Sequence, residues 1–234
     1  MSIKIWHSIV RVIRGIKGFI YDLGELGKPS HVEILDMLSI VCPKKDELIL
    51  DAGGGTGRFS LPIADLASLV VNVDICTQFL HWCKDKASKK SIELIRADIA
   101  NLPLRNEVFD KIICFDTLHH VQTDRKLALA ELYRCLKPDG FVLFRDTLRG
   151  EKGHLIYRLI DLTDFFYVRD MRVPGKKYKR EYWTREEYLN KLREAGFSVV
   201  KIEKEVKIAL GGTMHFIIAK KLRALLSNNL DFFS

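Results

Sequence analysis

The stretch Leu48-Ile-Leu-Asp-Ala-Gly-Gly-Gly-Thr-Gly57 decides the fold of this chain. Its apolar start predicts a buried parallel strand, because strands covered on both faces are continuous runs of apolar residues. The glycines allow a sharp turn and a close approach of the backbone to a ligand, since a Cβ atom would obstruct both. A helix is expected from Phe59 to Leu66. This order of elements predicts a small-molecule site at the carboxyl end of the first strand of an open α/β sheet.

The spacing of the glycines argues against a dinucleotide ligand. The dinucleotide fingerprint is Gly-x-Gly-x-x-Gly/Ala, and counting from Gly53 places Arg58 where the third small residue is required. Counting from Gly54 fails at Thr56. No Gly-Lys-Ser/Thr follows, so a phosphate-binding loop is not indicated. The pattern that fits is Asp-x-Gly-x-Gly-x-Gly at 51–57.

Length and composition limit the remaining classes. A chain of 234 residues, 47% hydrophobic and 29% charged, suits one globular domain with modest additions. We expect neither a membrane-spanning helix nor a signal peptide. The five cysteines lack Cys-x-x-Cys spacing, which favours reduced, mostly buried thiols and a cytoplasmic location, and no metal site is expected. The formal charge of +8 favours an anionic partner without identifying it.

Alternating strand and helix patterns continue along the chain. Strands are expected at 69–74, 92–98, 109–115 and 141–144, and helices at 31–41, 78–86 and 123–136. Lys137-Pro-Asp-Gly140 is expected to stop the last of these helices and form a turn. The alternation predicts an α/β fold with a doubly wound, mostly parallel sheet. A helix capped by Thr184 and a C-terminal antiparallel β-hairpin over 197–219 are expected to follow.

These features together resemble the Rossmann-like, or class I, S-adenosylmethionine-dependent methyltransferases. The motif at 51–57 is similar to their first motif, and a terminal hairpin is what distinguishes their sheet from that of dehydrogenases. The Leu-His-His segment at 118–120 and Leu-Lys-Pro-Asp-Gly at 136–140 resemble the broad family that includes ubiquinone/menaquinone-type and small-molecule methyltransferases. The resemblance implies a methyltransferase domain at 45–220 with a substrate-side insert at 150–183, an N-terminal helical lid at 1–44 and a tail at 221–234.

An adenosyl cofactor needs a carboxylate for its ribose, an acceptor and apolar faces for its adenine, and backbone groups for its methionine end. Asp74 follows Asp51 by 23 residues, near the ~20-residue offset of ribose-binding acids in Rossmann-type sites. The resemblance assigns the adenine amine to Asp98. Each strand-end Asp could instead cap the next turn. The expected cofactor-binding residues are Asp51, Gly53, Gly55, Gly57, Asp74, Ile75, Asp98, Ile99, Asp116 and Tyr21.

The segment Asp116-Thr-Leu-His-His120 ends the fourth expected strand. In the enzymes that the chain resembles, this segment lies along the methionine moiety and faces the acceptor. His119 and His120 are therefore the expected catalytic residues, which orient or deprotonate the acceptor, unless one of them only packs or caps a helix. A dedicated base is not required, because a sulfonium methyl group is already activated and orientation carries much of the rate.

The resemblance implies in-line transfer of a methyl group from S-adenosylmethionine to a small-molecule or lipid-like acceptor. The basic cluster at 171–180 leaves a tRNA or other RNA methyltransferase open, and loss of catalysis would leave a cofactor-binding regulatory protein. An amphipathic helix expected at 3–21 is either a lid or a peripheral contact with an anionic membrane. The acceptor atom and the oligomeric state do not follow from the sequence.

Overall fold

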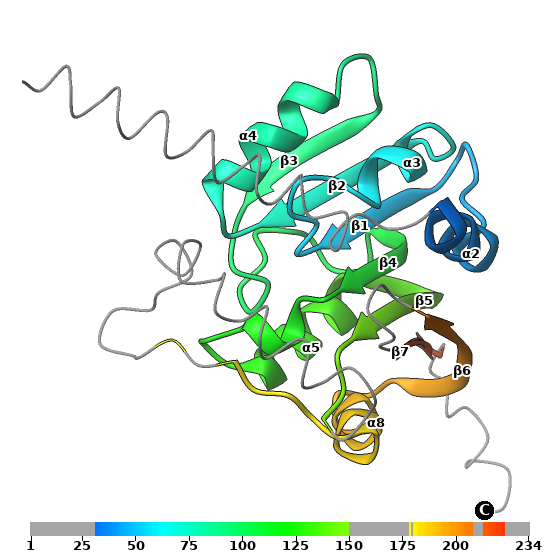
Figure 1. Ribbon diagram of the computed structural model, residues 1–234, viewed down its shortest axis with the longest axis vertical. Helices are drawn as coiled ribbons and strands as arrows, with labels where there is room; N and C mark the ends of the chain where they lie inside the picture. The colour runs from blue at the N-terminus through cyan, green and yellow to red at the C-terminus, as the bar shows by residue number, and fades with distance from the viewer. Residues whose placement is uncertain (1–30, 150–177, 179, 208–212, 223–234) are drawn as a thin grey trace, which may run out of the picture.

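A computed structural model describes residues 31–149, 178, 180–207 and 213–222 (Figure 1). The helix expected at 3–21, Tyr21, most of the 150–183 insert and the tail beyond residue 222 lie outside the described residues.

The described strands form one seven-stranded sheet in the order β3-β2-β1-β4-β5-β7-β6. Neighbouring strands are parallel from β3 to β5, and β7 runs antiparallel to both β5 and β6. The predicted doubly wound, mostly parallel sheet with a terminal antiparallel hairpin is therefore confirmed. The strands are β1 (Leu48–Ala52), β2 (Leu69–Asp74), β3 (Ile92–Arg96), β4 (Phe109–Phe115), β5 (Leu136–Asp146), β6 (Ser198–Lys207) and β7 (Thr213–Lys220).

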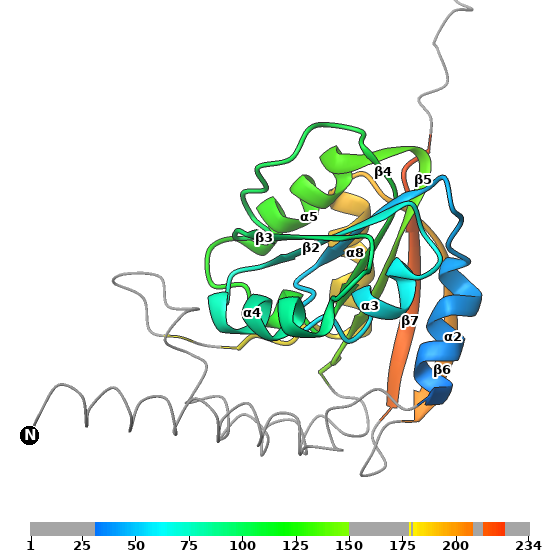
Figure 2. The same ribbon diagram turned by 90° about the horizontal axis from the view of Figure 1, so that it is seen from above.

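Helices cover both faces of this sheet. Figure 2 shows α5 and α8 on one side and α2, α3 and α4 on the other. The alternation of strands and helices in the sequence leads to this arrangement, because short connections place the helices on both faces of a parallel sheet. The helices are α2 (His31–Val41), α3 (Ser60–Ala64), α4 (Thr77–Lys86), the 3-10 turn η1 (Leu118–His120), α5 (Arg125–Cys135) and α8 (Arg185–Glu194).

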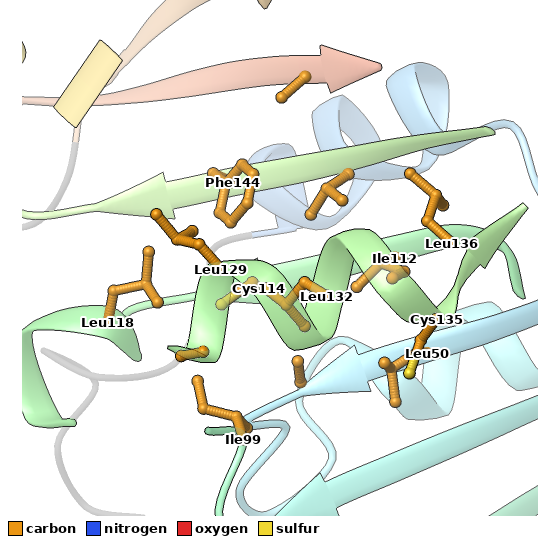
Figure 3. Packing of buried hydrophobic residues seen from close by; sticks show 14 of the residues in the cluster. Leu50, Ile99, Ile112, Cys114, Leu118, Leu129, Leu132, Cys135, Leu136 and Phe144 are labelled. Carbon is orange, nitrogen blue, oxygen red and sulfur yellow. The ribbon is translucent and has the colours of Figure 1, made fainter. Parts of the chain in front are cut away.

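Two apolar layers fix the sheet. On one face, Leu129 and Leu132 of α5 pack against Ile112 and Phe144 of the sheet (Figure 3). On the other face, α2 and α3 bury their own apolar residues against the sheet, and Met37 of α2 is fully buried. Each such side chain contributes roughly 1.5–3 kcal/mol to folding relative to full exposure. The strand ends that carry polar residues are thus held by a close-packed frame.

The ends of α8 follow the sequence signals. Thr184 accepts a hydrogen bond from the Glu187 amide at 3.2 Å, and the Glu187 carboxylate accepts one from the Thr184 amide at 2.7 Å. This reciprocal capping box satisfies backbone donors that the first turn leaves open. Gly196, at φ +95°, follows the helix.

The turn expected at 137–140 is wrong. Helix α5 ends at Cys135, and Lys137 to Gly140 belong to β5, which begins at Leu136. Phe109 pairs with Leu136 whereas Lys111 pairs with Phe141, so the extra residues form an irregularity in the ladder. Pro138 and Gly140, which are separated by one residue, suit such a bulge as well as they suit a free turn.

Within the described residues, no helix combines the length and apolar character that crossing a bilayer requires. All five cysteines are free thiols; Cys42 is exposed and the others are buried.

Candidate functional site

A pocket opens at the carboxyl ends of the parallel strands, where β1 and β4 are neighbours and the direction of winding reverses. Open α/β sheets bind ligands at this place. Gly57 and His119 do not line the pocket. The predicted site residues that line it are Asp51, Gly53, Gly55, Asp74, Ile75, Asp98, Ile99, Asp116 and His120.

The glycine-rich turn needs its glycines for different reasons. Gly53 and Gly57 have φ of +77° and +80°, which a side chain rarely adopts. A Cβ on Gly53 would lie 2.3 Å from the Thr117 side chain, and one on Gly57 would lie 2.5 Å from the Cys83 sulfur. Gly53 therefore lets the turn approach the end of β4, whereas Gly57 lets it pack against α4 away from the pocket.

Gly55 faces open space and holds the acid of the next strand. Its φ is +53°, and a Cβ placed there would meet nothing closer than Phe79 and Asp74, at 3.8 and 3.9 Å. Its amide donates to Oδ2 of Asp74 at 2.9 Å, and the amide of Cys76 donates to Oδ1 at 2.7 Å. Burial raises the pKa of Asp74 from its ordinary value of 3.8 to about 6, against the lowering effect of these amides. Two backbone donors thus orient a carboxylate that retains lone pairs for a ligand.

Asp51 lies below the turn and is 3% exposed. The Ser60 hydroxyl donates to its carboxylate, and the Asn72 amide donates to the Ser60 oxygen at 3.0 Å. Burial, together with the charge of Asp74, raises the pKa of Asp51 to about 7, although Ser60 opposes the shift. The side chain of Asp51 therefore joins the turn to the start of α3.

Apolar side chains and one acid form the wall beyond β2 and β3. Ile75, Ile99 and the Phe79 ring line the pocket together with Asp98. One oxygen of Asp98 accepts a hydrogen bond from the Thr123 hydroxyl at 3.0 Å. This wall can enclose a flat heterocycle and accept a hydrogen bond from its edge.

A buried arginine positions the acid at the end of β4. Asp116 has φ +52°, and its Oδ2 pairs with the guanidinium of Arg145 from β5. The same guanidinium pairs with Glu33 of α2 at 2.8 Å and lies over the rings of Phe59 and Phe115, at 4.8 and 5.1 Å from their centroids. Oδ1 of Asp116 is buried without a hydrogen-bond partner among the described residues. An orphaned carboxylate oxygen in a pocket wall suits a cationic or donor group of a ligand.

His119 turns away from the pocket. Its Nδ1 contacts the carboxylate of Asp146, the last residue of β5, and its ring stacks on Tyr182 with centroids 5.0 Å apart. The side chain is 6% exposed. His119 is therefore placed to anchor η1 to β5, and its predicted catalytic role stays untested.

His120 is the histidine that lines the pocket. Its Nδ1 shares a hydrogen bond of 2.6 Å with the hydroxyl of Tyr178. Desolvation, followed by the charges of His119 and Arg180, holds the pKa of His120 well below its ordinary value. The imidazole is therefore neutral at physiological pH, and its catalytic role also stays a prediction.

Several site residues were not found from the sequence. Asp146 ends a strand as Asp74 and Asp116 do, so the same positional signal could have found it. Arg145 is a basic residue that follows buried apolar residues in β5, and a charge in such a strand indicates a buried ion pair. No group of three or more His, Cys, Asp or Glu side chains suited to a metal occurs in the part of the chain that the structure describes.

Comparison with known proteins adds to this geometry. Residues 50–144 match a family model described as a methyltransferase domain. The matched segment contains the glycine turn and the acids at 51, 74, 98 and 116. It is a class I S-adenosylmethionine-dependent methyltransferase domain. The cofactor of this class is S-adenosylmethionine, and the pocket suits it: it has an oriented carboxylate, an orphaned carboxylate oxygen and a wall of apolar side chains.

Two curated relatives and one solved structure illustrate the relationship. The chain is similar to malonyl-[acyl-carrier protein] O-methyltransferase of Geobacter sulfurreducens, 31% identical over 168 residues, which are 68% of this chain and 59% of that protein. The tRNA (carboxymethyluridine(34)-5-O)-methyltransferase of Arabidopsis thaliana is 40% identical over 98 residues, 41% of this chain and 23% of that protein. The chain thus spans less than two thirds of the length of these relatives.

An S-adenosylmethionine-dependent methyltransferase from Thermotoga maritima has the same fold as this chain. The TM-score is 0.68 at 19% identity, and the superposition covers 90% of this chain and 98% of that one.

Proposed function

We propose that the chain transfers the activated methyl group of S-adenosylmethionine to a small-molecule or lipid-like acceptor by in-line displacement. The observation that carries this proposal is the convergence of the glycine turn, four strand-end acids and His120 on one pocket. Asp74 would hold the ribose hydroxyls, and Asp98, Ile75 and Ile99 would hold the adenine. Gly53, Gly55 and Asp116 would hold the methionine end.

When bound, the cofactor supplies a methyl group on a positively charged sulfur atom. The residues of the chain then have to hold the acceptor in line with the C–S bond and exclude water. Holding the reactants in this alignment lowers the activation barrier, because the entropic cost of orienting them is met on binding. The orphaned oxygen of Asp116 would accept a hydrogen bond from the cofactor's ammonium group, and Arg145 keeps that carboxylate in place. His120 lies on the same pocket wall and is the residue placed to meet the acceptor.

The names of the two relatives described above describe transfer to an oxygen atom, and they make an oxygen acceptor the candidate pursued here. The malonyl O-methyltransferase matches 68% of this chain, which supports a small acyl acceptor. The tRNA methyltransferase matches 41% of it and makes RNA the second candidate. RNA binding would be recognised by a steep loss of affinity with salt, since phosphate contacts release counterions.

A cofactor-binding regulatory protein without methyl transfer is the remaining alternative, and only a transfer experiment separates it. The five free thiols support a reducing, cytoplasmic location.

The test has two parts. Calorimetry should show that the chain binds S-adenosylhomocysteine, and incubation with labelled S-adenosylmethionine and extract should label the small-molecule or lipid fraction. Label in RNA would select the second candidate, and binding without label in any fraction would select the regulatory alternative. Absence of S-adenosylhomocysteine binding would overturn the proposal.

A further inference from the structure

We call the region around η1 the acceptor end: His120 of η1 lines the pocket, and residues 180–184 lie against η1 without lining the pocket themselves. The amide of Glu181 donates to the carbonyl of His119 at 3.3 Å, and the Arg125 guanidinium donates to the carbonyl of Glu181 at 3.0 Å. These contacts place Tyr178 and Arg180 beside the two histidines. The chemistry of this end therefore depends on side chains from two distant segments.

Described acids near this end are already engaged with cations or donors. Asp146 contacts His119 and accepts from the Thr147 amide at 2.9 Å. Asp116 pairs with a buried arginine, and Glu181 pairs with Arg125. A carboxylate base for a neutral hydroxyl, amine or carbon acid is thus missing from the described part of this end.

His120 is suited to donate a hydrogen bond and poorly suited to take a proton. Its Nδ1 is occupied by the Tyr178 hydroxyl at 2.6 Å, and Nε2 makes no hydrogen bond to the described residues. If the tyrosine hydroxyl donates to Nδ1, the proton of the neutral imidazole lies on Nε2. The groups that face the ring are His119, Tyr178 and Arg180, and the positive charge among them disfavours a second proton.

Arg180 adds a fixed cation to this end. Its Nη1 donates to the Tyr182 hydroxyl at 3.2 Å, and Tyr182 in turn stacks on His119. A guanidinium remains charged at every physiological pH and matches the planar shape of a carboxylate.

We infer that the acceptor group is a carboxylate, carried by a small acyl compound, which Nε2–H of His120 and the charge of Arg180 hold beside the cofactor. This inference rests on the proposed function. One carboxylate oxygen forms the new O–CH3 bond while the C–S bond breaks and its electron pair remains on sulfur. The products are a neutral ester and a neutral thioether, and no proton moves, so the reaction needs no base.

Binding to the protein saturated with S-adenosylhomocysteine tests the inference without turnover. The probes are a malonyl thioester and its amide analogue, which differ in charge and little in shape. We expect the acid to bind at least about tenfold more tightly, and Arg180→Met to remove most of that preference. Arg193→Met, an exposed arginine of α8, is the matched control and should change neither affinity. Equal binding of acid and amide would overturn the inference, and so would an unchanged preference in Arg180→Met.

His120→Gln separates a donor from a base. Glutamine keeps an N–H donor but cannot take a proton at neutral pH. For a carboxylate acceptor we expect labelling of the malonyl thioester to fall by no more than about tenfold, with a flat profile from pH 6 to 9. A loss of about 10²–10⁴-fold, typical of removing a general base, would overturn the inference.

The remaining outcomes are also informative. Binding of S-adenosylhomocysteine by His120→Gln and Arg180→Met shows that these variants are folded. If the unsubstituted protein binds S-adenosylhomocysteine but no carboxylate probe, the inference fails and the proposed function stands. Label that enters only carboxymethyl nucleosides of RNA would support the carboxylate chemistry and overturn the small acyl source.

Discussion

The two ends of the pocket are built from contacts of different range. At the cofactor end, Asp74 is held by amides 19 and 2 residues away, within one strand–turn–helix–strand unit. At the acceptor end, His120 meets Tyr178 at a separation of 58 residues, and His119 meets Asp146 at 27. The charges differ too, because Asp74 and Asp98 line the first end, whereas Arg180 lies close enough to His120 at the second to lower the pKa of its imidazole.

This difference in range suggests that the cofactor end is common to the domain, whereas the acceptor end is specific to this chain. A local unit can keep its geometry while the segment after β5 changes, so one cofactor site can serve different acceptors. Substitutions at the cofactor end should therefore change S-adenosylhomocysteine binding, whereas those at the acceptor end should not.

The largest effect is expected from Asp74→Ala. The variant loses a charged acceptor for two hydroxyls, and hydrogen bonds to charged groups contribute roughly 1.5–3 kcal/mol each, so affinity for S-adenosylhomocysteine should fall by about 10²-fold or more. Calorimetry gives the affinity. Asp65→Ala, at an exposed acid paired with Lys90, is the control and should bind normally. Unchanged affinity in Asp74→Ala would remove the assigned ribose role.

Gly55→Val should weaken S-adenosylhomocysteine binding by at least about thirtyfold. A β-branched residue is strained at φ +53°, and its side chain would occupy the space in front of Asp74. The melting temperature should also fall, because the strain is present without ligand. Tight binding by this variant would show that the ligand does not approach the turn.

The pH dependence of binding should sharpen the contrast. Because the pKa of Asp74 is about 6, its carboxylate is ionised above this pH and protonated below it. Affinity for S-adenosylhomocysteine should therefore fall about tenfold from pH 7 to pH 5. Since the folded pKa lies above the ordinary value of 3.8, this group's contribution to stability instead declines as the pH rises from about 4 to above 6. Asp74→Asn should flatten the pH dependence of affinity, whereas the stability should still decline with pH because the pKa of Asp51 is also raised, to about 7. A dependence of affinity that persists in this variant would assign it to another group.

The smallest effect on the site is expected from Thr184→Ala. Loss of the capping box should cost about 1 kcal/mol of unfolding free energy, measured by urea denaturation. Affinity for S-adenosylhomocysteine should not change, because α8 belongs to the segment after β5. A parallel loss of affinity would show that the two ends are not independent.

The sequence predicts the cofactor end well because its signals are local. The run at 48–57 specifies a strand, a turn and a helix, and the acids that end β1 and β2 follow from strand periodicity. Asp98 lies two residues beyond β3 and lines the pocket, and its contact with adenine stays a prediction.

The acceptor end could not be predicted in the same way. His119 and His120 are adjacent, so only the geometry of η1 and partners far along the chain decide which of them faces the pocket. The bulge at 137–140 was missed because proline and glycine mark turns and bulges alike. Gly57 reads as part of the ligand motif, yet its neighbour is Cys83 on α4.

The side chain of Arg145 connects the start of α2 to the wall of the pocket. One guanidinium pairs with both Glu33, in the first turn of α2, and Asp116, on the pocket wall. Loss of Arg145 would therefore leave both carboxylates without their shared cation, which is destabilising where the groups are buried. A ligand that binds Asp116 would change how Arg145 is shared with Glu33, and any coupling between the two places would act equally in both directions.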